Sequence, residues 1–411
     1  MERVVVTGVG VISALGAGRE AFWRGLATGA SGLRPLSLFA ARPGGSRLAG
    51  EIAEFSPGPF IGTKGIRHFD RTTLLLACAA KLALDDAGLP SGSAEDGALA
   101  DRIGMAVGST YGSIGSIAAF DTEALREGPS YVNPMEFPNT VLNAPASRVS
   151  ILLGVTGPNT TISTGETSGL DALGYATDFL RLGRADGMLA GGAFGLGEDV
   201  YLGFARTGAL SGSRGGDELC APFDARRNGI VLGEASCLLF LEPLARAHKR
   251  GARIYGEIAR YGNGFRPRGS DPIARGRRVI RAALGSAGLL PPDISCVFGG
   301  ANSTAAGDRL EAETLRAAFD GAAACPPVSA IKSMCGECLD ASGALQAAAA
   351  LLALREHVVP PTINHQVADG DCDVDCVPNA ARRMEVRQAL VTASSPAGHC
   401  AALLLSACTD G

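Results

Sequence analysis

The chain has 411 residues, of which 46% are apolar and 19% are charged, and this composition excludes an intrinsically disordered protein. A formal net charge of −4 disfavours a protein that binds nucleic acid. No apolar run is long enough to span a membrane, and residues 1–4 lead directly into a strand-like run without the pattern of a signal peptide. We therefore expect a cytoplasmic protein whose cysteines are thiols.

Strand-like and helix-like segments alternate along the chain. Runs of β-branched residues that end in glycine predict buried strands, and apolar residues at helical spacing before a Gly or Pro stop predict helices. In chain order we expect a strand at 3–10, a helix at 71–88, a strand at 102–108, a helix at 168–182, strands at 187–192, 231–241 and 252–260, a helix at 271–287, a strand at 294–299, a helix at 341–356, and strands at 388–393 and 401–407. The alternation predicts an α/β layered fold. A charged helical segment at 246–253 suggests two halves, 1–250 and 251–411.

Eight segments that occur in a fixed order are more specific than this pattern. They are VVVTGVGVISALG at 4–16, GPNTTIST at 157–164, LAGGA at 189–193, PFDARRNGIVLGEA at 222–235, AHKRGARIYGEI at 247–258, GD and EA within 307–312, IKSMCGE at 331–337 and VPPTIN at 359–364. Together the segments resemble the β-ketoacyl-ACP synthase family of the thiolase superfamily. The resemblance implies the thiolase fold, with two similar βαβαβαββ halves in a five-layer αβαβα arrangement, and a dimer.

The residues that perform catalysis in this family are replaced here. Working members use a Cys nucleophile at a helix N-terminus, where the thiolate is favoured, and two His that stabilise an enolate. The resemblance places Glu166 at the nucleophile position and Gly300 and Glu337 at the two His positions, whereas the family's Lys is retained as Lys332. A carboxylate cannot hold an acyl chain as a thioester. The resemblance therefore implies a chain without condensing activity of its own.

Two further segments of the family's site also differ. Ile230 stands where the family has a Phe beside the site, and the segment 395–400 replaces the gating Gly-Phe-Gly-Gly-Thr-Asn. This set of losses resembles the chain-length factor, or ketosynthase-β, of type II polyketide synthases. Such a protein pairs with an active ketosynthase in a heterodimer and closes the far end of the acyl tunnel. The commonest replacement of the Cys is Gln, so Glu leaves open whether the product is aromatic or a reduced polyene.

The resemblance also suggests which residues serve the tunnel and the partners. Bulky residues after the Gly-rich segment at 108–116 end the tunnel in chain-length factors, and the corresponding candidates are Tyr111, Ile114, Ser116 and Phe120. The expected partners are an active ketosynthase and the acyl carrier protein that bears the growing chain. Basic residues that would meet the acidic carrier are Lys64, Arg67 and Arg71. The Gly-rich segment lacks the ending of a phosphate-binding loop, and we expect no cofactor.

Two enzymatic interpretations remain open. Some ketosynthase-like domains decarboxylate malonyl-carrier protein to prime a chain, but they retain both His. Alternatively, Glu166 and Glu337 could act as an acid/base pair, because two close carboxylates split their pKa values. The simpler interpretation is structural. Glu166 then fills a vacated pocket and pairs with Lys332, or Lys332 forms a buried pair with Glu311 or Glu337.

Other reactive side chains carry weaker signals. Cys335 and Cys338, Cys372 and Cys376, and His365 have spacings that resemble a metal site, but the first pair lies inside a family motif that binds no metal. Ser395 and His399 suggest a catalytic pair, yet a lone His in a loop is more often a satisfied polar residue. We expect neither a metal nor Ser–His catalysis.

Overall fold

A single mixed sheet of eleven strands organises the chain. The computed structural model describes residues 2–42, 45–89, 102–267 and 269–408. The sheet order is β11-β10-β14-β15-β9-β1-β8-β7-β5-β6, with the short β2 paired to β1. The bounds are β1 Val4–Ser13, β2 Gly16–Ala17, β5 Ile103–Gly108, β6 Asn159–Ile162, β7 Gly187–Phe194, β8 Ala235–Pro243, β9 Gly256–Phe265, β10 Cys296–Phe298, β11 Val328–Ser329, β14 Gln388–Ser394 and β15 His399–Ser406.

The sheet consists of two sets of five strands with the same topology. From β1 outwards, β8 and β7 follow in antiparallel pairs and β5 and β6 in parallel pairs. From β9 outwards, β15 and β14 are antiparallel and β10 and β11 are parallel in the same way. The two sets join through only two residue pairs of β1 and β9, Val5 with Glu257 and Val6 with Gly256. This repeat is that of a thiolase-like fold.

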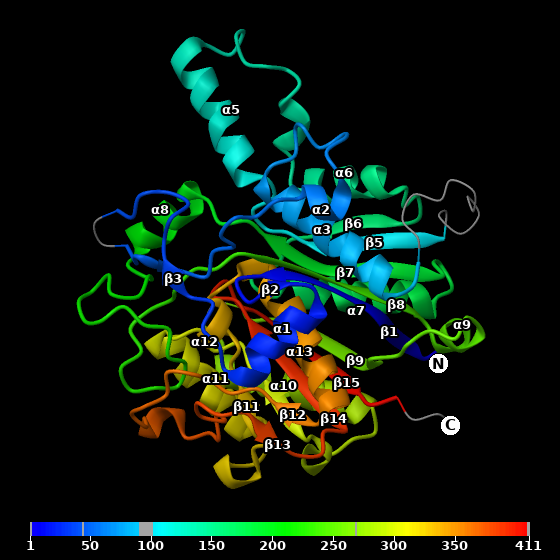
Figure 1. Cartoon of the computed structure of the whole chain (residues 1–411). Helices are drawn as coiled ribbons and strands as arrows, with labels where there is room; N and C mark the ends of the chain where they lie inside the picture. The colour runs from blue at the N-terminus through cyan, green and yellow to red at the C-terminus, as the bar shows by residue number, and fades with distance from the viewer. Residues whose placement is uncertain (1, 43–44, 90–101, 268, 409–411) are drawn as a thin grey trace.

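Helices complete five layers around the two sets of strands (Figure 1). Helices α3 and α6 cover the outer face of the first set, and α10 and α11 cover the outer face of the second set. Helices α7 and α13 contact strands of both sets, so they form the middle layer. The bounds are α1 Arg19–Thr28, α2 Gly58–Ile61, α3 Arg71–Asp86, α5 Ile114–Glu127, α6 Ala144–Leu153, α7 Ser168–Arg181, α8 Glu198–Thr207, α9 Leu244–Lys249, α10 Pro272–Ser286, α11 Ala305–Ala318, α12 Lys332–Cys335 and α13 Ser342–Glu356.

Helix α13 shows why the sequence folds into layers. Residues 342–354 of this helix are all buried, and most of them are Ala or Leu. A helix that is apolar on every side belongs in the interior, because no face of it is solvated. Gln346 is its one long polar side chain in that stretch, and its Nε2 donates to the carbonyls of Phe298, Gly299 and Thr392. The helix thereby holds the ends of β10 and β14 in place beside the candidate site.

Helix α5 leaves the body of the protein together with the chain that follows it, as the cyan segment of Figure 1 shows. We call residues 114–142 the arm. Large apolar side chains on the arm are exposed, including Leu125 at 87%, Tyr131 at 76% and Phe137 at 60%. The Gly-rich start of this segment predicts a loop, so the helix was not expected from the sequence. An exposed apolar patch of this kind marks an interaction surface.

The remaining differences from the sequence-based elements concern both element ends and whole elements. The strand expected at 231–241 begins only at Ala235, and the one expected at 252–260 begins at Gly256 and runs on to Phe265. The elements that were not predicted are helices α1, α2, α6, α8, α11 and α12 and strands β2, β6 and β11. Two small sheets, β3 Arg34–Pro35 with β4 Leu48–Ala49 and β12 Val358–Val359 with β13 Arg382–Arg383, lie outside the main sheet. No described helix is both long and apolar enough to cross a bilayer.

The packing of α3 on β1 leads to a test of stability. A Cβ at Gly10 would lie 1.9 Å from the carbonyl oxygen of Ala79 on α3, so the two elements would have to move apart. We expect Gly10→Ala to lower the free energy of unfolding by at least about 2 kcal/mol, measured by urea denaturation. Gly285→Ala is the matched control, because a Cβ there meets no atom within 4 Å. An unchanged stability of Gly10→Ala would contradict the close approach.

Candidate functional site

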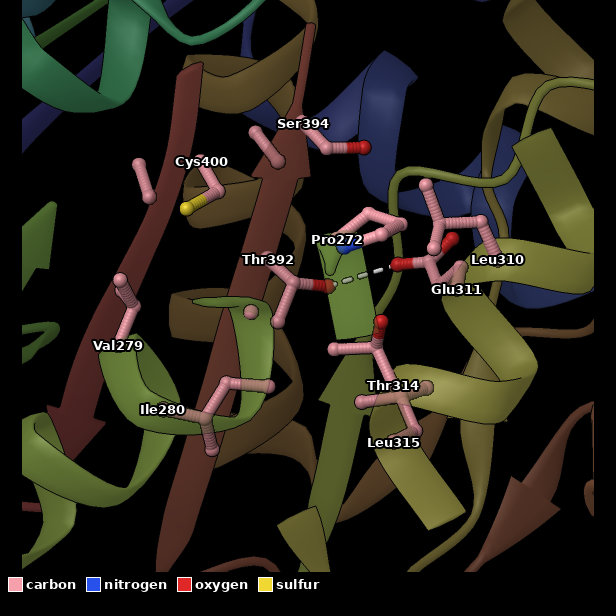
Figure 2. A pocket seen from close by; sticks show the side chains of 13 residues that line it. Pro272, Val279, Ile280, Leu310, Glu311, Thr314, Leu315, Thr392, Ser394 and Cys400 are labelled. Carbon is pink, nitrogen blue, oxygen red and sulfur yellow. Dashed lines mark hydrogen bonds between the residues drawn. The ribbon is translucent and has the colours of Figure 1, made fainter. Parts of the chain in front are cut away.

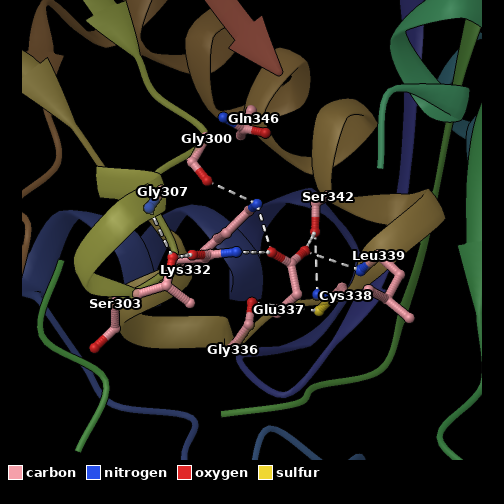
Figure 3. Close-up of polar contacts among 12 residues, drawn as sticks. Gly300, Ser303, Gly307, Lys332, Gly336, Glu337, Cys338, Leu339, Ser342 and Gln346 are labelled. Carbon is pink, nitrogen blue, oxygen red and sulfur yellow. Dashed lines mark hydrogen bonds and ion pairs between the residues drawn. The ribbon is translucent and has the colours of Figure 1, made fainter. Parts of the chain in front are cut away.

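A buried ion pair occupies the centre of the candidate site (Figure 3). Lys332 begins α12, and its Nζ donates to Glu337 Oε2 at 2.8 Å and to the carbonyl of Gly300 at 2.9 Å. The side chains of Lys332 and Glu337 are 7% and 2% exposed. Asn302 Nδ2 donates to the same Glu337 oxygen at 3.0 Å. The residue at one former His position is therefore a carboxylate that is fully engaged, and the residue at the other supplies a backbone acceptor.

The second oxygen of Glu337 is also satisfied. Its Oε1 accepts from Ser342 Oγ at 2.8 Å and from the backbone N–H of Leu339 at 3.1 Å. Burial alone would lower the pKa of Lys332, but the charge and hydrogen bond of Glu337 outweigh it, and the pKa is raised. Lys332 therefore stays a cation, and Glu337 is held by four donors. A carboxylate in this setting is poorly suited to exchange protons with a substrate.

Glu166 lies apart from this ion pair. It precedes Thr167, the residue before α7, and it is half-buried. Within the described part of the chain its carboxylate has no hydrogen-bond or ion-pair partner, and Lys332 senses it only as a more distant charge. Of the structural interpretations, the pairing of Glu166 with Lys332 is therefore wrong, and the buried pair of Lys332 with Glu337 is confirmed. The physical reason is competition, because Glu337 reaches Lys332 at 2.8 Å and brings three further donors with it.

Glu311 is the third carboxylate of the region. From α11 its Oε1 accepts from the backbone N–H of Gly300 at 2.7 Å and from Thr392 Oγ1 at 2.8 Å, the contact drawn in Figure 2. Its other oxygen is buried without a partner. Burial raises the pKa of Glu311 above its usual range. Glu311 therefore fixes the loop after β10 rather than pairing directly with Lys332.

Two cavities adjoin the site. The inner cavity, of about 350 Å³, is lined by Gly300, Asn302, Glu311 and Glu337 among others. The outer cavity, of about 860 Å³, is lined mainly by apolar groups of Tyr111, Ile114, Val200, Gly203 and Phe204. Both walls include Glu166, Phe204, Ala209, Leu339, Ser395, Pro396 and His399. The two cavities therefore share a boundary that includes Glu166 and the loop at 395–399.

That loop is a tight connection between β14 and β15. The backbone N–H of Ser395 donates to the carbonyl of His399, and the N–H of Gly398 donates to the carbonyl of Ser395, each at 2.8 Å. The His399 ring packs on Phe265 at 5.0 Å between centroids. Ser395 Oγ accepts from the backbone N–H of Ala397, and no described hydrogen bond joins its hydroxyl to the His399 ring. The geometry gives no Ser–His pair.

Asp340 is a residue of the region that the sequence did not reveal. It is 1% exposed, and its Oδ2 accepts from the backbone N–H of Thr110 at 2.7 Å, whereas Oδ1 has no partner. Burial raises the pKa of Asp340 to about 6, and the charge of Glu166 contributes in the same direction. Its environment is formed by the distant segment at Thr110, so no local pattern in the sequence could have identified it.

The four tunnel candidates fall into two groups. Tyr111 and Ile114 line the outer cavity, and Tyr111 packs on Phe194 at 6.0 Å between ring centroids. Burial and the charge of Glu166 raise the pKa of Tyr111. Ser116 and Phe120 lie further along α5, where Phe120 packs on Phe137 of the arm at 6.1 Å, away from the described walls of both cavities. Their role in a tunnel stays a prediction.

The three basic candidates differ in whether their side chains are free at the surface. Lys64 and Arg67 are exposed in the segment between α2 and α3. Arg71 is not a free surface cation, because its guanidinium binds Glu234, whose side chain is fully buried, and the carbonyl of Ile52. Arg71 thereby anchors the start of α3. Only Lys64 and Arg67 remain available among the three for contact with an acidic partner.

The cysteines with metal-like spacing are buried thiols. Cys335, Cys338, Cys372 and Cys376 are free, and burial raises the pKa of each. Across residues 2–42, 45–89, 102–267 and 269–408, no group of three or more His, Cys, Asp or Glu side chains is arranged to hold a metal ion. Cys400 lines the inner cavity, but burial raises the pKa of its thiol as well. The cavity walls therefore leave room for an acyl chain but provide no activated cysteine thiol among the described residues.

Comparisons with known proteins show which protein family the chain resembles. The family models "Beta-ketoacyl synthase, N-terminal domain" and "Beta-ketoacyl synthase, C-terminal domain" match residues 1–247 and 256–366. The chain is 34% identical to 3-oxoacyl-(acyl-carrier-protein) synthase 2 of Coxiella burnetii, over 99% of both chains. It is 36% identical to the ketoacyl synthase alpha subunit of the tetracenomycin polyketide synthase of Streptomyces glaucescens, over 98% of this chain and 97% of that one.

Solved structures that are similar to this chain include proteins described as ketosynthases, as do the sequence relatives. "The ishigamide ketosynthase/chain length factor" matches with a TM-score of 0.91 and 33% identity, over 99% of this chain and 100% of that chain. The complex "AntDE:AntF (apo): type II PKS acyl-carrier protein in complex with its ketosynthase bound to the hexaketide" matches with a TM-score of 0.88 and 29% identity, over 99% and 100% of the two chains. The similarity spans the full length of the described fold.

The ion pair leads to a second test of stability. Lys332→Met leaves the Glu337 carboxylate buried without its cation, and we expect a loss of about 3–5 kcal/mol in the free energy of unfolding. Adding Glu337→Gln removes that charge and leaves groups that still hydrogen-bond with Ser342 and Leu339. The double variant should therefore be more stable than the single one by at least about 1 kcal/mol in urea denaturation. A double variant no more stable than Lys332→Met would show that the pair is not coupled.

Proposed function

The chain belongs to the β-ketoacyl synthase family, and from that premise we propose that it acts as a chain-length factor (ketosynthase-β) of a type II polyketide synthase. In this role it has no condensing activity of its own. It pairs with an active ketosynthase, and its side chains shape the cavity that receives the growing chain. The observation that carries the proposal is a fully bonded Lys332–Glu337 ion pair whose Glu337 lines the inner cavity, next to the mainly apolar outer cavity.

The site geometry supports the absence of condensation. Acyl transfer needs a nucleophile and groups that stabilise an oxyanion or enolate. The nucleophile position holds the Glu166 carboxylate, and the two His positions hold Gly300 and the engaged Glu337. The same replacements disfavour decarboxylation of a malonyl group, because the developing enolate would meet a carboxylate instead of a hydrogen-bond donor. A priming decarboxylase is therefore the weaker alternative.

The surface of the chain supports a heterodimer. The arm, which carries exposed apolar side chains, lies on the same side of the protein as β6 (Figure 1), and among the described residues no further strand pairs with the outer edge of β6. A free edge and an apolar patch are both features that a partner chain covers. Two copies of this chain would supply no nucleophile, so we propose that the partner is a ketosynthase with an intact Cys and both His. The related structure "The ishigamide ketosynthase/chain length factor" names both kinds of protein together.

Chain length in this proposal is a steric outcome. An acyl chain that enters the outer cavity extends until it meets side chains that cannot move without repacking. Tyr111, packed on Phe194, and Ile114 are the described residues best placed to end it. The acyl carrier protein that delivers the chain would dock through acidic side chains, with Lys64 and Arg67 as the exposed basic candidates.

The partner is tested by co-purification. A tagged copy of the chain is recovered from its native host at low salt, and the proteins present in equal amount are identified by mass spectrometry. We expect one ketosynthase homologue that retains the Cys and both His. Recovery of this chain alone as a stable homodimer would contradict the proposed function.

The cavity is tested by filling it. Gly203 lies in α8 on the wall of the outer cavity, and a Cβ there meets no atom within 4 Å. We expect Gly203→Phe, in complex with the ketosynthase, to shift the products to chains shorter by at least one extension step, as measured by mass spectrometry of the released polyketides.

The control for this experiment is Gly285→Phe. Gly285 also lies in a helix, and its Cβ also meets open space, but it is on α10 away from both cavities. Its products should match those of the wild-type complex. Unchanged chain length in Gly203→Phe, with the complex intact, would remove the outer cavity from the proposed mechanism.

A further inference from the structure

The wall of the outer cavity carries acidic side chains. Its described wall contains the carboxylates of Glu166 and Asp199 and no Lys or Arg, with His399 as the only other titratable side chain besides Tyr111. The remainder of the wall is mainly apolar. A cavity of this composition accepts uncharged chains and disfavours anions.

Glu166 lies where the linings of the inner and outer cavities overlap, and we call this shared boundary the passage. It is part of both walls, and within the described chain no donor or cation binds its carboxylate. Lys332 is held by Glu337. Burial is the main reason that the pKa values of Tyr111 and Asp340 are raised, and the charge of Glu166 adds to the effect in both cases. An unneutralised negative charge therefore faces any group that moves through the passage.

The cations of the inner cavity do not cancel this charge at the passage. Arg266 and Arg275 line the inner cavity, together with Glu311 and Glu337, and neither arginine forms an ion pair with Glu166. Burial raises the pKa of the Cys400 thiol, and the charge of Arg275 offsets part of that increase. The two arginines are therefore features of the inner cavity alone, since neither contributes to the wall of the outer one.

We propose that Glu166 is a specificity-determining residue that admits chains with an uncharged end to the outer cavity and rejects chains that end in a carboxylate. A carboxylate brought to the passage loses part of its hydration and meets a like charge, whereas an amide, ester, ketone or alkyl end meets no such penalty. The inference deepens the proposed function and rests on it for the identity of the chain as an acyl group. The preference itself is a property of this chain and needs no partner.

Decanamide and decanoate provide a matched pair of probes, because their head groups have nearly the same shape and differ in charge. Isothermal titration calorimetry at pH 7.5 measures the affinity of each for the full-length chain. We expect the wild-type chain to bind decanamide about tenfold more tightly than decanoate. Glu166→Gln should bring the two affinities to within about twofold by improving the binding of decanoate, and Glu166→Asp should retain the preference.

Two control variants locate the effect. Glu356→Gln removes a glutamate charge at an exposed position at the end of α13, outside both walls, and should leave the ratio unchanged. Gly203→Phe fills the outer cavity and should weaken the binding of both probes. Equal wild-type affinities, no measurable binding of decanamide, or a ratio that Glu166→Gln leaves unaltered would each overturn the inference.

Failure of this inference is distinguishable from failure of the proposed function. A chain without the charge preference that still co-purifies with an intact ketosynthase remains a chain-length factor with a different basis for selection. A chain that shows the preference but recovers no ketosynthase keeps a charge-selective binding cavity and loses its proposed role.

Discussion

The bond between Lys332 and Glu337 is the interaction on which the candidate site depends. Moving both charges out of water is costly, and the cost is offset only when every donor and acceptor is satisfied. Here the loop after β10 supplies Gly300 and Asn302, α12 supplies the lysine, and Leu339 and Ser342 come from the segment before α13 and from its first residue. The pair therefore joins three separate segments of the second half.

The symmetry of the sheet explains where this bond can form. The buried helices α7 and α13 form the middle layer between the two sets of strands. In this layer α7, from the first half, packs against the segment just before α13, from the second half. Glu166 comes from the first half and lines both cavities, whereas Lys332 comes from the second half and binds Glu337, which lines the inner cavity. A site at such a junction can lose its chemistry while the scaffold stays intact, because the strands and helices that build it are stabilised by their own apolar contacts.

The sequence was sufficient to predict the layers of the fold and to propose most residues of the candidate site, but not the ion pairs and hydrogen bonds among them. Alternating strands and helices predicted an α/β fold, and the ordered motifs implied five layers and identified Glu166, Gly300, Lys332 and Glu337. Three carboxylates were candidates to pair with Lys332, and the choice depended on the hydrogen bonds that Asn302 and Ser342 donate to Glu337. Tertiary folding brings these residues together, so their spacing in the sequence could not decide the pairing. Helix α5 was missed because a Gly-rich run precedes it, and Asp340 because its burial arises from a distant loop.

The arm has a consequence for how the protein persists in a cell. Its apolar side chains face water in the isolated chain, and such surface is recognised by chaperones and proteases and promotes aggregation. A copy whose arm stays uncovered is thus exposed to quality control, whereas a covered copy is protected. The steady-state abundance of the protein would then follow the supply of whatever chain covers the arm, and equal stoichiometry would arise by degradation of the excess without any matching of synthesis rates.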